Sequence, residues 1–178
     1  IEEAKVTGAT ELNLRFQELI ELPPELFQLE QLNTLYLGSN ELTELSPEIS
    51  QLQQLTTLEL LNNQLTELPL ELFQLKQLTM LYLSYNRLTE LPPEIGQLAN
   101  LALLALIGNQ LSSLPHQVFQ LPKLTRLWLM DNQLTYLPPQ IVQLPNLKEL
   151  ELEVNPLTSP PYELATQGMD AIREYFAS

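Results

Sequence analysis

Leucine recurs along this chain at short spacings of two and three residues, nested inside a longer period. Aligned on its regularly spaced asparagines, the sequence divides into units of 23 residues with the pattern LxxLxLxxNxLxxLPxEIxxLxx. These asparagines are Asn40, Asn63, Asn86, Asn109, Asn132 and Asn155. Seven units begin at Ala9, Leu32, Leu55, Leu78, Leu101, Leu124 and Leu147. The period predicts a stacked array of identical structural units over residues 9–159.

The alternation of leucines within each unit predicts one short strand, since side chains in a strand point alternately to opposite faces. Strands of successive units are expected to pair in parallel as a curved sheet. The LPPEI segment cannot continue as a central strand, because proline lacks the N–H donor and fixes φ. It should return the chain along the convex side in short helical or extended pieces. The predicted fold is an α/β solenoid.

The conserved spacing also assigns roles to the asparagines and to the two ends. Each asparagine is expected inside the turn after its strand, bonded to otherwise unpaired backbone groups of adjacent units. An exposed layer of leucines at either end needs a cap. Residues 1–8 are interpreted as the remnant of an N-terminal cap in a chain cut from a longer protein. Residues 160–178 are interpreted as a helical C-terminal cap, with Met169, Ile172 and Phe176 on one helical stripe.

Positions three, five and seven of each unit flank the buried leucines and should therefore face the concave surface. In the middle and later units these positions are mostly apolar or aromatic, whereas units one and seven carry polar or charged residues there. A contiguous exposed apolar patch typically marks an interaction site, and Trp, Tyr, Met and Arg are enriched at interfaces. The predicted contact residues are Tyr36, Met80, Tyr82, Leu103, Ile107, Arg126, Trp128 and Met130. The alternative interpretation is an idle face whose residues merely favour strands and cross-strand packing.

A second period of 46 residues underlies the first. At position five the even units carry Tyr36, Tyr82 and Trp128, while odd units carry smaller or charged residues. Strands about 4.8 Å apart would place these aromatic rings roughly 9–10 Å from one another. We expect slots between the rings that accept side chains of a partner.

Composition narrows the class of partner. With 22 acidic and 8 basic side chains the formal charge is −14, which disfavours nucleic acid and anionic membranes and favours a partner with basic flanks. Glutamates recur at positions thirteen and seventeen of the first four units, and an alternative role for these ladders is solubility. The chain has no cysteine, which favours a reducing compartment and predicts a cytoplasmic protein. No apolar run approaches the length of a membrane span or a signal peptide.

Catalytic chemistry is not indicated by any motif. The single histidine, His116, lies in a predicted convex turn without partners for a metal site or a triad, and no glycine-rich phosphate loop is present. Glu149, Glu151 and Glu153 share one strand face but cannot surround a cation. We predict a protein that is not an enzyme and has no cofactor or metal.

The repeat resembles the leucine-rich repeat family over nearly the whole chain, through its LxxLxLxxNxL and LPxEIxxL motifs. Its 23-residue unit is similar to bacterial and cytoplasmic members of that family. The opening AKVTGATELNLRFQELIELPPEL and the closing NPLTSPPYELATQGMDAIREYF resemble the repeat region of bacterial Roco-type multidomain GTPases. The family resemblance implies a binding module for a protein or peptide. The narrower one implies the alternative, a cis-regulatory or dimerisation scaffold that contacts a neighbouring domain of a larger GTPase.

Overall fold

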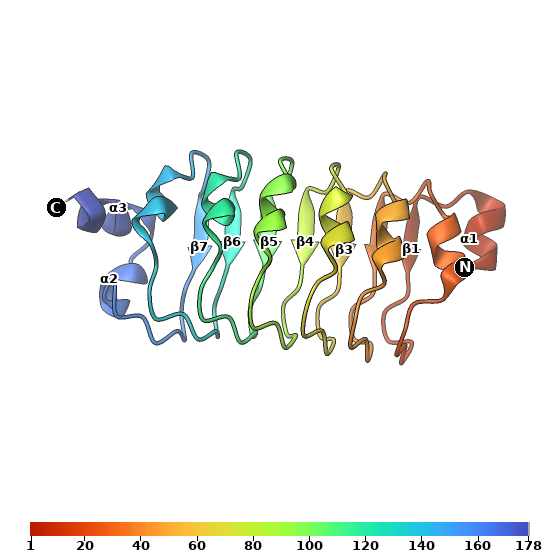
Figure 1. Cartoon of the computed structure of the whole chain (residues 1–178), viewed down its shortest axis with the longest axis horizontal. Coiled ribbons are helices and arrows are strands. Elements are labelled where there is room, and N and C mark those ends of the chain that lie inside the picture. Colours follow the sequence, from red (N-terminus) through yellow and green to blue (C-terminus); the bar gives the residue numbers. More distant parts are fainter. Residues whose placement is uncertain (178) are drawn as a thin grey trace.

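The computed structural model describes residues 1–177 and contains one seven-stranded parallel sheet. Each strand is three residues long and pairs with the next strand in sequence, so the sheet order is β1 to β7 without crossing (Figure 1). The strands are β1 Glu11–Asn13, β2 Thr34–Tyr36, β3 Thr57–Glu59, β4 Met80–Tyr82, β5 Leu103–Ala105, β6 Arg126–Trp128 and β7 Glu149–Glu151. The predicted α/β solenoid is confirmed.

The proline-containing segments return the chain as short 3-10 helices on the side opposite the strands (Figure 1). Their first turns begin at or just after proline, whose fixed φ suits the start of a helix and whose missing donor is not needed there. They are η1 Pro24–Gln28, η2 Pro47–Gln51, η3 Leu70–Gln74, η4 Pro93–Gln97, η5 His116–Gln120 and η6 Pro139–Gln143. Phe27, Phe73 and Phe119 are buried beneath the odd-numbered helices and fill the convex side of the core.

The core is a continuous column of leucines between the sheet and the 3-10 helices. The leucines at positions four and six are fully buried in units two to six, for example Leu81 and Leu83, whereas Leu12 and Leu14 in the first unit remain partly exposed. Burial therefore rises from the ends to the middle, as expected when each unit completes the core of its neighbour.

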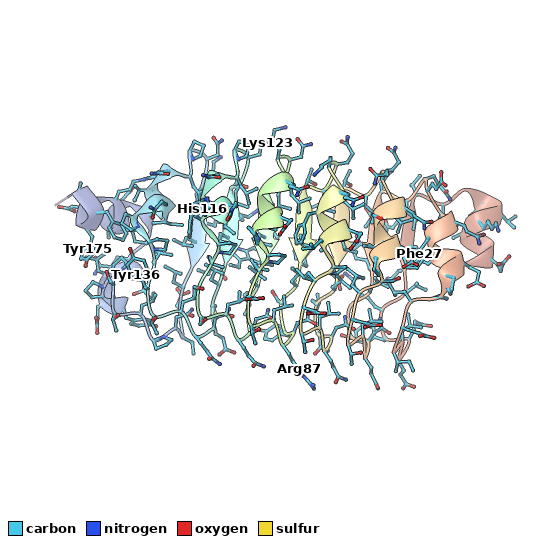
Figure 2. All side chains as sticks on the ribbon, viewed as in Figure 1. Phe27, Arg87, His116, Lys123, Tyr136 and Tyr175 are labelled. Carbon is cyan, nitrogen blue, oxygen red and sulfur yellow. The ribbon has the colours of Figure 1, made fainter. Side chains whose placement is uncertain are left out.

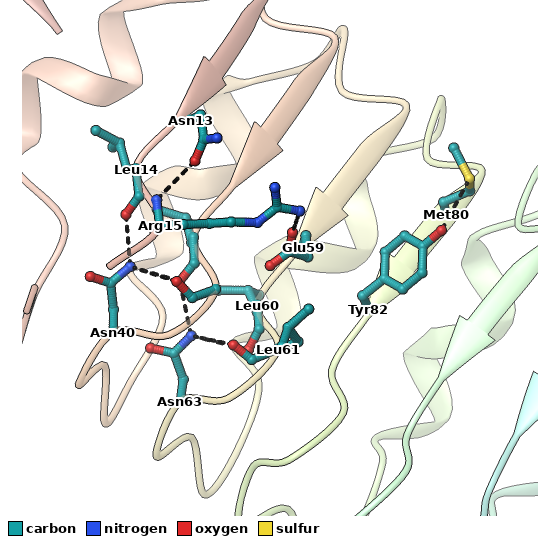
Figure 3. A network of polar contacts seen from close by, with 12 residues as sticks. Asn13, Leu14, Arg15, Asn40, Glu59, Leu60, Leu61, Asn63, Met80 and Tyr82 are labelled. Carbon is teal, nitrogen blue, oxygen red and sulfur yellow. Dashed lines mark hydrogen bonds and ion pairs between the residues drawn. The ribbon is translucent and has the colours of Figure 1, made fainter. Parts of the chain in front are cut away.

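The asparagines form a buried ladder between the units. Asn63 donates through Nδ2 to the carbonyls of Leu37, in the preceding unit, and Leu60, at 3.0 and 3.1 Å (Figure 3). Its Oδ1 accepts the N–H of Leu42 at 3.1 Å. The same three bonds recur at each asparagine of the ladder, with Asn40 bonding to the first unit in the same way. The predicted role of these residues is confirmed.

Position eight of every unit lies in the left-handed region, with φ between 54° and 65°. This conformation turns the chain out of the strand just before the ladder asparagine. The residues are Phe16, Ser39, Asn62, Tyr85, Gly108, Asp131 and Val154. Only Gly108 adopts such a φ without steric cost, and Val154, which is β-branched, is the least suited.

Helices lie at both ends of the solenoid, and the termini are at its opposite extremes (Figure 1). The first is α1 Glu2–Thr7, and the last two are α2 Tyr162–Ala165 and α3 Met169–Ala177. Ile172 is fully buried against the last repeats, with Met169 and Phe176 packed beside it. Ser178, the last residue of the predicted C-terminal cap, lies outside the described residues. Within residues 1–177 no helix has the length and apolar character needed to cross a membrane.

Candidate functional site

The exposed face of the sheet, formed by positions three, five and seven and called the concave face below, alternates between ridges and floors. The register aligns position five of neighbouring strands, so that Glu59 lies between Tyr36 and Tyr82, and Ala105 between Tyr82 and Trp128. The three aromatic side chains are half-buried and stand as ridges. Glu59 and Ala105 are 2% and 1% exposed and form the floors between them.

Most of the predicted contact residues are accessible on this face. Met80, Ile107, Arg126 and Met130 are each partly exposed. Leu103 is an error of the sequence analysis, because it is fully buried and offers no surface to a partner. It pairs with Met80 on one side and Arg126 on the other, both of which have longer side chains.

Each aromatic ridge has its own local contacts. The Tyr82 hydroxyl donates to Sδ of Met80 at 3.6 Å, which ties the two side chains together (Figure 3). The indole Nε1 of Trp128 is buried and has no acceptor among the described residues. The exposed part of that indole is therefore hydrocarbon, which makes this end of the concave face apolar.

Of the two predicted slots, the first is an open hollow of about 320 Å³ over Glu59. Glu59 forms its floor, and the two tyrosines stand at its sides. The hollow is lined by Arg15, Thr34, Tyr36, Thr57, Glu59, Leu61, Met80 and Tyr82. The hollow is a mixed polar and aromatic site within a face predicted to be apolar.

An ion pair inside this hollow escaped the sequence analysis, which assigned Arg15 to a charged end of the sheet. The guanidinium of Arg15 extends across Tyr36, 4.1 Å from the ring centroid, and Nη2 donates to Oε2 of Glu59 (Figure 3). The other carboxylate oxygen, Oε1, is buried and has no partner among the described residues. The signal that could have revealed it is a lone glutamate, Glu59, among mostly uncharged outward positions.

Gly38 makes room for that carboxylate. A Cβ at this position would overlap Oε1 of Glu59 and would lie 3.2 Å from Cγ of Leu61. A side chain at this position would therefore force the Glu59 carboxylate to move, and the backbone of Gly38 is not in the left-handed region.

The C-terminal rim of the concave face is acidic. Burial raises the pKa of Glu151 above its ordinary value, and the negative charges of Glu153 and Glu149 raise it further. This rim lies beside Trp128, which pairs with Glu151 across the last two strands. A cationic group on a partner would relieve the repulsion among the three carboxylates.

The single histidine and a ladder of glutamates lie outside the concave face. His116 is exposed at the start of η5, on the helical side of the molecule (Figure 2). In residues 1–177 no cluster of three or more histidine, cysteine, aspartate or glutamate side chains is placed to hold a metal ion. The ladder glutamates Glu21, Glu44 and Glu67 line a separate hollow of about 280 Å³.

The family model described as leucine rich repeat matches residues 7–60, 53–111 and 99–157. The chain belongs to the leucine-rich repeat family. Domains of this family generally mediate protein–protein binding and are typically not catalytic. No match was found among curated proteins.

Solved structures of bacterial and plant proteins share the fold. An internalin, InlF, from Listeria monocytogenes is 28% identical with a TM-score of 0.76, covering 88% of this chain and 45% of the internalin. The leucine-rich repeat domain of the type III effector XopL is 31% identical with a TM-score of 0.76, covering 86% and 55%.

A plant receptor ectodomain also has a similar structure. The ectodomain of the receptor kinase GASSHO1/SCHENGEN3 from Arabidopsis thaliana, solved in complex with CASPARIAN STRIP INTEGRITY FACTOR 2, is 32% identical with a TM-score of 0.62. The match covers 77% of this chain and 20% of the receptor. This chain thus spans about half or less of the length of these three proteins.

Proposed function

We propose that this domain is a non-enzymatic module that binds a protein or peptide on its concave face. The observation that carries the proposal is the row of half-buried aromatic ridges Tyr36, Tyr82 and Trp128, spaced two strands apart, with methionines in the units of the last two. Aromatic side chains with a buried base and an exposed tip provide large contact areas with little loss of side-chain entropy. The plant receptor ectodomain solved with its bound factor is a relative that acts by binding.

The charge of the protein adds a preference for basic partners. The formal charge of −14 and the acidic rim at Glu149, Glu151 and Glu153 would attract positive flanks, mainly by accelerating association. Arg126, which is partly exposed, would pair with an acceptor on the partner. The absence of cysteine and the resemblance of the 23-residue unit to bacterial proteins support a bacterial cytoplasmic setting, which fractionation of cells that express the natural protein would test.

The alternative is a cis-regulatory or dimerisation scaffold of a Roco-like GTPase. It rests on the similarity of the two sequence ends described above. The aromatic ridges of the concave face favour the binding module over this alternative. They can bind a separate partner directly, whereas the scaffold role requires a further domain or a second copy of the chain. Light scattering on the isolated domain measures self-association directly.

The binding proposal is tested by selecting peptides from a random library on the wild-type domain. Selected peptides should lose at least tenfold in affinity for the double variant Tyr82→Ala with Trp128→Ala, the loss expected when two interface anchors are removed. The matched control is Tyr136→Ala with Tyr162→Ala, which removes two exposed aromatic rings outside the concave positions and should leave affinity unchanged. Equal affinity for the wild type and the folded concave-face variant would refute the proposal.

A further inference from the structure

The carboxylate of Glu59 is buried with only half of its hydrogen-bonding capacity satisfied. The residue is 2% exposed, Oε2 accepts from Arg15, and Oε1 has no partner among the described residues. An ionised carboxylate accepts several hydrogen bonds, and burial without them is unfavourable. The free protein therefore holds a negative charge on the concave face that a further donor would stabilise.

The cation that now neutralises Glu59 belongs to the first unit, two units away from Glu59, and lines the hollow. Arg15 lies 44 residues away in the first unit, and its side chain is 35% exposed. One of the five N–H donors of the guanidinium bonds to Glu59, and the same group lies over the face of Tyr36. Because one partner of this pair is buried, Glu59 needs a cation at all times, whereas the partly exposed Arg15 side chain can move into solvent when another cation takes its place.

The hollow has the composition of a cation site. Tyr36 and Tyr82 stand on either side of Glu59, two strands or about 9–10 Å apart, so a cation midway would lie about 5 Å from each ring. Cation–π attraction extends to about 6 Å from a ring centroid. Arg15 already demonstrates this contact on Tyr36. At the outward positions of units two to six Glu59 is the one acidic residue.

We propose that the hollow over Glu59 binds a lysine or arginine side chain of the partner, and that Arg15 is a displaceable internal cation that occupies Glu59 until the partner arrives. This inference rests on the proposed binding function of the concave face. On displacement, the guanidinium of Arg15 leaves the Glu59 carboxylate, and the guanidinium or ammonium group of the partner takes its place. The net negative charge of the protein favours the incoming cation, and the partner side chain gains a second aromatic wall from Tyr82.

The experiment uses N-acetyl-arginine methylamide as the probe and N-acetyl-citrulline methylamide, its uncharged isostere, as the control. Binding to the whole domain is followed at low salt through the NMR signals of the rings of Tyr36 and Tyr82. The arginine probe should bind in the millimolar range and shift both rings, and citrulline should shift neither. Arg15→Gln should tighten binding of the arginine probe at least threefold, because the internal competitor is gone.

Glu59→Gln should weaken the arginine probe at least tenfold. Tyr82→Leu, which removes one wall and leaves the ion pair intact, should weaken it at least threefold and keeps the proposal testable if the charge variants unfold. Unchanged affinity in folded Glu59→Gln, or weaker affinity in folded Arg15→Gln, would overturn the inference. Shifts by N-acetyl-glutamate methylamide that require Arg15 would also overturn it, since they would show an anion site.

The peptide selection and the arginine-probe experiment together distinguish a failure of the subsite from a failure of the proposed function. If selected peptides depend on Tyr82 and Trp128 but the arginine probe fails, the subsite is wrong and the binding face stands. If the probe binds as described and no peptide is selected, the subsite stands and the proposed function fails.

Discussion

Replacing Asn86 by alanine tests how the solenoid distributes its buried hydrogen bonds. Asn86 donates to the carbonyls of Leu60 and Leu83 at 2.9 and 3.0 Å, and its Oδ1 accepts the N–H of Leu65 at 3.0 Å. The variant loses all three bonds. We expect the free energy of unfolding to fall by about 3 kcal/mol, from one orphaned buried N–H at about 1–3 kcal/mol and two lost bonds at about 0.5–1.5 kcal/mol each.

The loss of stability is limited because each of these carbonyls accepts hydrogen bonds from two asparagines. Leu83 also accepts from Asn109 at 3.0 Å, and Leu60 also accepts from Asn63. A single substitution therefore leaves each carbonyl with one partner, and only the Leu65 N–H is left without one.

This sharing predicts coupling between neighbouring asparagines. In Asn86→Ala with Asn109→Ala, the carbonyl of Leu83 loses both partners, so the double variant should be about 1–2 kcal/mol less stable than the sum of the single variants. Asn132 donates to Leu106 and Leu129 and shares no carbonyl with Asn86, so that pair should be additive within about 0.5 kcal/mol.

Urea denaturation followed by circular dichroism measures all six proteins: the wild type, the three single variants at Asn86, Asn109 and Asn132, and the two double variants. The denaturant slopes must agree among variants, because repeat proteins can lose two-state behaviour when one unit is weakened. Equal coupling in both pairs would refute the shared-carbonyl reasoning, as would single variants with unchanged stability.

Three further substitutions test local features. Val154→Asn should stabilise by about 1 kcal/mol in urea denaturation, because Val154 has φ of 57° and asparagine tolerates that region, whereas Asp131→Asn should have no effect. Gly38→Ala should destabilise by about 1–3 kcal/mol through overlap with Glu59, and should be nearly neutral in a Glu59→Ala background; a similar loss in both would contradict the role of space. Glu151→Gln should raise the free energy of unfolding at neutral pH by up to about 1 kcal/mol. The pKa of Glu151 is raised in the folded state, so the folded state binds a proton more readily than the unfolded state does. The stability of the wild type should therefore rise as the pH falls through that pKa. The difference from wild type should vanish by about pH 3, well below the ordinary glutamate pKa of about 4.3, where the carboxyl is protonated in both states. A difference that persists there in thermal melts would exclude the charge explanation.

The scaffold was predictable from the sequence because its determinants recur at fixed positions. A leucine that returns every 23 residues, or a buried asparagine such as Asn86, has the same environment in each unit, so one unit explains all of them. The aromatic ridges were predictable for the same reason, since strand alternation decides which side chains face outward.

The floors between the ridges depend on neighbours that differ from unit to unit. Whether Leu103 is exposed depends on the lengths of Met80 and Arg126 on adjacent strands, and strand alternation alone does not contain that information. The contact between Arg15 and Glu59 crosses two strands and depends on side-chain conformation and on the space left by Gly38. Neither follows from a pattern of single positions.

The scaffold of the chain repeats every 23 residues, whereas the pattern of its concave surface repeats every 46 residues. Excising one 23-residue module, such as residues 55–77, would leave the leucine column and asparagine ladder in register. It would also place Tyr36 and Tyr82 on adjacent strands about 4.8 Å apart and remove Glu59. Length can thus vary by single modules without loss of the fold, but a natural or engineered change that keeps the character of the binding surface must add or remove 46 residues at a time.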